Sequence, residues 1–103
     1  QLYHDGYLEA VSVKQTDVFE AAEEFARVEG ILPAPESGHA ILAAMNEAKK
    51  CTEAGEEKVI LFGLTGTGYF DLVAYEKFHN GEMVNFVPTD EDIERSLAQL
   101  PRV

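Results

Sequence analysis

The turn at residues 65–68, with the sequence TGTG, is the stretch of this chain whose residue types could bind a ligand. Its glycines, Gly66 and Gly68, allow positive φ angles and a close approach of the backbone to a ligand. The turn follows an apolar run at residues 59–64, and ligands of open α/β sheets bind beyond the carboxyl ends of the strands. It could therefore cradle a phosphate or a cofactor ring, or be a glycine-rich structural turn with no ligand.

Two nucleotide-binding patterns do not fit this turn. The dinucleotide fingerprint requires a glycine or alanine at the position after Phe70, where Asp71 stands. A Walker loop requires a Gly-Lys-Ser/Thr sequence, and none follows the turn. The spacing alone therefore leaves the ligand open.

Glu29 is the second candidate, because it lies at a predicted helix-to-loop junction just before Gly30. A carboxylate there could point into a cleft, or it could be a solvated surface glutamate. The three histidines do not stand at metal-ligand spacing from another ligand, so we predict no metal site; they are His4, His39 and His79.

Hydrophobic spacing and turn signals predict alternating strands and helices. The predicted elements of the first half are a strand at residues 8–13, a helix at residues 17–28 capped by Thr16, a connection at residues 29–38, and a helix from Ser37 or His39 to Ala54. Small residues line one stripe of the second helix, so it could pack close to a sheet. This order suits a parallel α/β arrangement.

The second half begins with the apolar run at residues 59–64, predicted to be a strand buried on both faces of a parallel sheet. The elements predicted after it are a helix from Leu72 to about Asn80 capped by Asp71, an extended segment at residues 82–87, a capping box formed by Thr89 and Asp92, and a final helix that includes Leu100 and ends at Pro101.

The chain of 103 residues is predicted to be one small domain or a piece of a larger one. Its formal net charge of -11 repels phosphate backbones and anionic membrane surfaces, so we expect neither nucleic acid nor membrane as a partner. One cysteine cannot form an internal disulfide, and no leader or membrane-spanning run is found. We therefore expect a cytoplasmic location.

Several motifs, taken together and in order, resemble the C-terminal part of tryptophan synthase β subunits, closest to the second, stand-alone-type class. They are FEAA at residues 19–22, ARVEGILPAPESGHAI at residues 26–41, LFGLTGTGYFD at residues 61–71, and a tail with Tyr75, Gly81 and the closing Leu100-Pro101. The resemblance covers nearly all of the chain. It implies an α/β fold, a partial three-layer sandwich with a short parallel sheet flanked by helices, as a fragment of the fold-type II pyridoxal-phosphate enzymes.

The resemblance also implies an activity for the full-length parent. Such an enzyme is a carbon-oxygen lyase that condenses L-serine with indole to L-tryptophan by β-replacement, using pyridoxal 5'-phosphate. The Schiff-base lysine and the phosphate-binding loop of the family lie upstream of the matched region. No lysine of this chain matches the catalytic one; its lysines are Lys14, Lys49, Lys50, Lys58 and Lys77. We therefore expect the chain, as a single C-terminal portion, to hold no catalytic residue, no bound cofactor and no activity alone.

The resemblance assigns cofactor-binding roles to Thr65, Gly66 and Glu29. Thr65 stands where the family has a serine or threonine that hydrogen-bonds the pyridine nitrogen, and the backbone at Gly66 lies against the ring. Glu29 matches the glutamate of the family's EGI motif, near the ring and its 3′ oxygen. The sequence departs from the family at Gly63, where asparagine is frequent, and at Thr67, where a basic residue or histidine is usual, so the acceptor substrate stays open.

A hydroxyl opposite a pyridine nitrogen has a definite chemical consequence. An alcohol is too weak an acid to protonate the nitrogen, whereas a carboxylate would hold the proton there. A neutral ring is a weaker electron sink, which favours β-replacement over transamination.

The alternative from another class is a free-standing acidic α/β module that binds a partner at the turn and performs no chemistry. The two hypotheses differ in whether a lysine and a phosphate loop lie upstream. A piece of a sheet should also expose apolar edges, so we expect this chain to self-associate and the parent to be a homo-oligomer.

Overall fold

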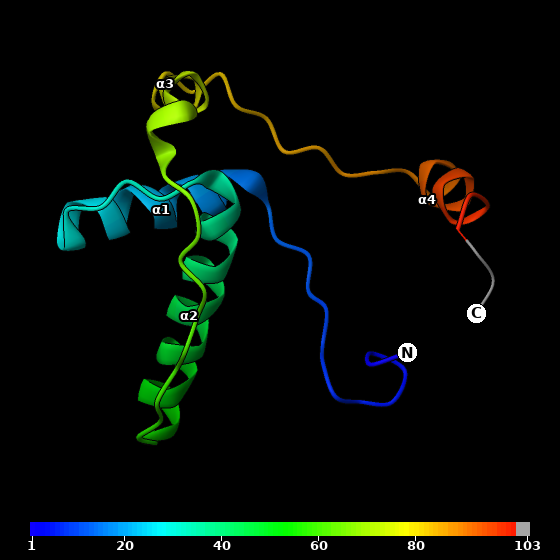
Figure 1. The fold of residues 1–103 in the computed structure, drawn as a ribbon, viewed down its shortest axis with the longest axis horizontal. Helices are drawn as coiled ribbons and strands as arrows, with labels where there is room; N and C mark the ends of the chain where they lie inside the picture. The colour runs from blue at the N-terminus through cyan, green and yellow to red at the C-terminus, as the bar shows by residue number, and fades with distance from the viewer. Residues whose placement is uncertain (101–103) are drawn as a thin grey trace.

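The computed structural model describes residues 1–100, whose regular elements are helical (Figure 1). The elements are α1 (Gln15–Glu29), α2 (Pro35–Ala54), the short 3-10 helix η1 (Gly68–Phe70), α3 (Leu72–His79) and α4 (Asp90–Leu97). Within these described residues there is no β-strand, only an isolated antiparallel bridge between Pro33 and Thr67. None of the helices in this part of the chain has the length and apolar character needed to cross a membrane.

α2 ends at Ala54 as predicted and α1 ends one residue later than predicted, at Glu29, while both helices begin earlier than predicted. Gly30 and Gly55 end α1 and α2 in the left-handed conformation, with φ angles of 71° and 67°. α2 begins at Pro35, whose fixed φ suits the first position of a helix. α1 begins at Gln15 rather than after Thr16, because the side-chain oxygen of Asn85 accepts the Thr16 N–H at 3.1 Å.

The core lies where α1 packs against α2 and α3 (Figure 1). The rings of Phe19 and Tyr75 meet edge to face, with centroids 4.9 Å apart. A Cβ added at Gly38 would come within 2.8 Å of Val18 Cγ1, so the two helices cross closely at this glycine. The small-residue stripe of α2 therefore packs against a helix, not against the sheet that the sequence predicted.

The prediction of a strand buried on both faces at residues 59–64 is wrong for the described structure. This segment is extended and runs back alongside α2 (Figure 1), but Val59 is 100% exposed and Leu61 is 96% exposed. Within the segment only the side chains of Ile60 and Phe62 are half-buried. Phe62 contacts Phe25, with ring centroids 6.1 Å apart. A sheet requires a neighbouring strand for the backbone N–H and C=O groups, and none lies beside this segment within residues 1–100. The predicted parallel sheet is therefore absent from this part of the chain.

The segment predicted as a strand at residues 8–13 leaves the helical body as an arm (Figure 1). The extended run at residues 82–87 first bonds the start of α1, where Asn85 contacts Thr16, and then continues as a second arm towards α4. The radius of gyration is 16.3 Å, above the roughly 13 Å of a compact chain of 100 residues, so the structure is open. At the end of the second arm, the predicted capping box of α4 is confirmed. Leu100 lies beyond α4, and the predicted stop at Pro101 falls outside the described residues.

Candidate functional site

The fold joins the two motifs that the sequence singled out separately, the connection after α1 and the TGTG turn. Pro33 pairs with Thr67 in the antiparallel bridge, and the N–H of Gly68 donates to the carbonyl of Leu32 at 2.9 Å. The hydroxyl of Tyr75 donates to the carbonyl of Pro33 at 2.6 Å. The turn is therefore fixed to the connection between α1 and α2, and Tyr75 of α3 holds the same connection.

The two glycines of the turn serve different structural needs. Gly66 has a φ angle of 70°, as predicted, and a Cβ there would lie 3.1 Å from the Cβ of Ala34. Gly68 has no positive φ, but a Cβ there would lie 2.5 Å from the Pro33 carbonyl oxygen and 2.8 Å from Leu32 Cγ. The chain itself approaches both glycines closely, which explains them without a ligand.

Thr65 is exposed, yet its backbone is held on both sides by one buried side chain. The hydroxyl of Ser37 donates to the carbonyl of Thr65, and the N–H of Thr65 donates to the same hydroxyl at 3.0 Å. The two hydroxyl oxygens lie 3.4 Å apart. Ser37 is only 2% exposed and belongs to the first turn of α2. The threonine predicted to face a ligand is thus anchored to a helix.

Glu29 is not joined to this turn in the structure. It is the last residue of α1 and is exposed, immediately before the left-handed Gly30. Within residues 1–100, no hydrogen bond or ion pair connects its carboxylate to Thr65 or Gly66. Thr65 and Gly66 adjoin in the sequence, and the structure leaves Glu29, the third predicted site residue, apart from them at a helix end.

Tyr75 behind the turn stays protonated over a wide pH range. Burial raises the pKa of its hydroxyl to about 12, and the negative charges of Asp71 and Glu23 add to this effect. The hydroxyl therefore keeps the proton that it donates to Pro33 at any pH where the protein would work.

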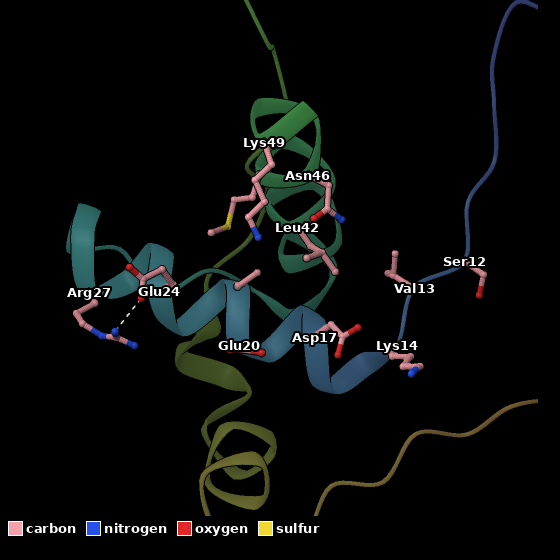
Figure 2. Close-up of a pocket in the computed structure, with 12 residues that line it drawn as sticks. Ser12, Val13, Lys14, Asp17, Glu20, Glu24, Arg27, Leu42, Asn46 and Lys49 are labelled. Atoms are coloured by element: carbon pink, nitrogen blue, oxygen red, sulfur yellow. Dashed lines mark hydrogen bonds and ion pairs between the residues drawn. The ribbon is translucent and has the colours of Figure 1, made fainter. Parts of the chain in front are cut away.

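A hollow of about 820 Å³ lies elsewhere, in the angle between α1 and α2 (Figure 2). Figure 2 shows charged side chains of both signs around it, among them Lys49 from α2 and Asp17 and Glu20 from α1. Glu24 and Arg27 pair across one turn of α1 at 2.7 Å. None of Thr65, Gly66 and Glu29 lines this hollow, so it is separate from the predicted site.

No pattern in the sequence pointed to the contact between Ser37 and Thr65. The two residues are 28 positions apart, and Ser37 stood in a glycine- and proline-rich stretch where a serine suggests only a helix start. In the sequence, Tyr75 stands out only as part of the family resemblance. A serine near the start of a helix is a weak indication of such a contact, and the contact can be identified only when the structure places the turn beside that serine.

Comparison with known proteins identifies the family. Residues 1–66 match the model of the family described as pyridoxal-phosphate dependent enzyme. The tryptophan synthase beta chain 2 of Aquifex aeolicus is 65% identical over 85 residues, which are 82% of this chain and 20% of that protein. The protein of the same name from Methanosarcina mazei is 54% identical over 83 residues, 81% of this chain and 19% of the relative. That of Pyrococcus furiosus is 43% identical over 100 residues, which are 97% of this chain and 22% of that protein.

These findings confirm the resemblance seen in the motifs, and they favour it over a free-standing binding module. The chain spans about a fifth of the length of the curated relatives that it matches. Because the family model covers more than half of the 103 residues, the chain belongs to the family of pyridoxal-phosphate dependent enzymes.

Proposed function

We propose that residues 1–103 are a single C-terminal portion of an enzyme that condenses L-serine with indole to give L-tryptophan. The reaction is a β-replacement that uses pyridoxal 5'-phosphate and places the parent among the carbon-oxygen lyases. The names of the similar proteins support this proposal. The observation that carries it is an exposed hydroxyl, that of Thr65, held in place at the turn by the buried Ser37.

The residues of the turn fit the ring of this cofactor. Its pyridine nitrogen requires a neutral hydrogen-bond donor if it is to remain unprotonated, and Thr65 offers such a donor on an exposed side chain. When bound, pyridoxal phosphate supplies an electron sink for carbon–hydrogen and carbon–oxygen bond cleavage at the amino acid. Thr65 would hold the ring nitrogen, and the backbone at Gly66 would lie against the ring.

The hydroxyl of Thr65 also selects the reaction. Because an alcohol cannot give up its proton to a pyridine, Thr65 keeps the ring nitrogen neutral while still hydrogen-bonding it. A ring with a neutral nitrogen withdraws electron density less strongly, which favours replacement at the β carbon over transamination. The neutral side chain at this position therefore supports the proposed reaction type.

Glu29 is proposed to lie near the ring and its 3′ oxygen in the complete enzyme. Support comes from its place just before the connection that pairs with the turn through Pro33 and Thr67. The carboxylate is exposed at the end of α1, so it is free to face a ligand. This role is distinct from that of Thr65, and each can be tested separately.

We further propose that the parent is a cytoplasmic homo-oligomer, and that this chain alone is inactive. The family's Schiff-base lysine has no match among the lysines of the sequence. Mixing the chain with serine, indole and pyridoxal phosphate should therefore yield no tryptophan and no visible absorbance band of a lysine-bound cofactor. Tryptophan formation by the chain alone would contradict this part of the proposal.

The role of Thr65 is tested by Thr65→Asp in the complete enzyme that carries this segment. The carboxylate should protonate the ring nitrogen and shift products from tryptophan towards transamination, because the ring becomes a stronger electron sink. Product partition is measured by chromatography, with Thr52→Asp at an exposed threonine of α2 as the control and Thr65→Ser as the variant that keeps the hydroxyl. An unchanged partition in Thr65→Asp would contradict the proposal.

A further inference from the structure

We infer that Ser37 is a positioning residue that orients Thr65 and leaves the proton of the Thr65 hydroxyl free for a ligand. The inference rests on the proposed function in one respect, namely that Thr65 faces the cofactor ring. The contact between the two residues stands on the structure itself.

The distribution of hydrogens between the two residues carries the first step. A serine hydroxyl has one proton to donate and two lone pairs to accept with. Ser37 gives its proton to the carbonyl of Thr65 and accepts the N–H of Thr65 at 3.0 Å. It therefore has no second proton for the Thr65 hydroxyl, and Thr65 must be the donor in any bond between the two oxygens.

The second step concerns the bond that remains. The oxygens of the two hydroxyls are 3.4 Å apart, well beyond the 2.7–2.8 Å that is usual for O–H···O bonds. A ligand nitrogen placed in line would therefore compete easily for the Thr65 proton. The arrangement makes Thr65 a donor rather than an acceptor, as a neutral pyridine nitrogen requires.

The third step is rigidity, because the turn is anchored at both ends. Ser37 is buried in the first turn of α2, beside the close helix crossing at Gly38 and Val18, and it holds the start of the turn. The bridge from Pro33 to Thr67 holds the other end. A catalytic or binding hydroxyl is effective only when neighbouring groups keep it in a narrow range of positions. Ser37 supplies this restraint at Thr65.

The direct experiment is amide hydrogen exchange by NMR on the complete enzyme that carries this segment, with Ser37→Ala. Removing the acceptor should speed exchange at the Thr65 amide about 10-fold, the effect of losing one hydrogen bond of typical strength. Ser96→Ala is the matched control, because that exposed hydroxyl donates to the Asp92 carbonyl at 2.8 Å, remote from the turn, and should leave Thr65 unchanged. Unchanged exchange at Thr65 in Ser37→Ala would overturn the inference.

If Ser37→Ala loses the dispersed amide signals of α1 and α2, Ser37→Cys keeps the size of the side chain with a weaker donor and acceptor. Exchange at Thr65 should then lie between wild type and full exposure. Exchange equal to wild type in the cysteine variant would overturn the inference as well.

A second measurement separates this inference from the proposed function. In the complete enzyme, Ser37→Ala should weaken pyridoxal phosphate binding about 10-fold and shift the visible absorbance of the bound cofactor, as Thr65→Val should. If Thr65→Val leaves both unchanged while Ser37→Ala still frees the Thr65 amide, the role of Thr65 fails and the anchor stands. If Thr65→Val has its effect and Ser37→Ala has none, only the positioning role of Ser37 is wrong.

Discussion

Two adjacent parts of this chain differ sharply in the burial and hydrogen bonding of their residues. The junction, which we define as residues 31–37, the turn 65–68 and Tyr75, contains a serine that is 2% exposed and a tyrosine that is 7% exposed, both hydrogen-bonded. The open segment, residues 58–64, leads directly into the turn and contains Val59 and Leu61, which are almost wholly exposed. The more apolar of the two parts is therefore the less buried.

The difference lies in where each part finds its partners. The junction is closed by contacts between α2, α3 and the turn, all of them within the described residues. The open segment contacts α1 through Phe62 and Phe25, and within residues 1–100 no strand pairs with its backbone groups. The contacts that hold Thr65 are therefore all present within residues 1–100, whereas no sheet partner for the apolar run is found there.

Adding a methyl group to one glycine in each part should show the largest difference in stability between the junction and the open segment. Gly68→Ala places a Cβ 2.5 Å from the Pro33 carbonyl oxygen, so the junction must shift, and we expect a loss of about 3 kcal/mol in the free energy of unfolding. Gly63→Ala in the open segment meets nothing within 4 Å and should change it by less than about 0.5 kcal/mol. Urea unfolding of the two variants measures both, and equal effects would contradict the contrast.

Tyr75→Phe should produce the next largest effect. It leaves the Pro33 carbonyl without its buried donor, which costs about 1–2 kcal/mol, whereas Tyr69→Phe at an exposed ring should be nearly neutral.

The same hydroxyl gives a pH dependence whose sign follows from its raised pKa. In the unfolded chain the tyrosine ionises near its ordinary value of about 10, while in the fold Tyr75 ionises at about 12. Stability should therefore be full below pH 10 and fall as the pH rises from about 10 to about 12. Thermal unfolding across this window should show the fall in wild type and a smaller one in Tyr75→Phe. Equal falls would contradict the buried environment of Tyr75.

The smallest effect on stability is expected in the open segment. Changing both Val59 and Leu61 to serine should leave the free energy of unfolding within about 0.5 kcal/mol, because neither side chain is buried. The same change should reduce self-association of the chain, seen by light scattering, since it removes the most exposed apolar side chains. Phe62→Ser, which loses the contact with Phe25, should instead cost about 1 kcal/mol. A strictly monomeric wild type would contradict the predicted association.

Local signals predicted the helical part of this fold well. The end of α2 at Ala54, the positive φ of Gly66 and the capping box at Thr89 follow from short-range chemistry, and each is confirmed. Asp71 takes the predicted cap position of α3, but its side chain makes no capping bond. The same residue also ends the short helix η1 that directly precedes α3. These are features that a few neighbouring residues decide.

Long-range pairing could not be predicted in the same way. The apolar run at residues 59–64 has the composition of a buried strand, but burial depends on neighbours that its own sequence does not specify. The link between Ser37 and Thr65 spans 28 positions and leaves no periodic trace. Glu29 was placed beside the cofactor through the resemblance alone, and this assignment remains a prediction.

The proposed function depends on a hydrogen bond that Thr65 donates to a neutral pyridine nitrogen. The most direct measurement is the 15N chemical shift of ring-labelled pyridoxal phosphate bound to the complete enzyme. We predict the shift of an unprotonated, hydrogen-bonded nitrogen in wild type, and that of a protonated nitrogen in Thr65→Asp. A protonated nitrogen in the wild-type enzyme, or a shift that does not change in Thr65→Asp, would contradict the claim.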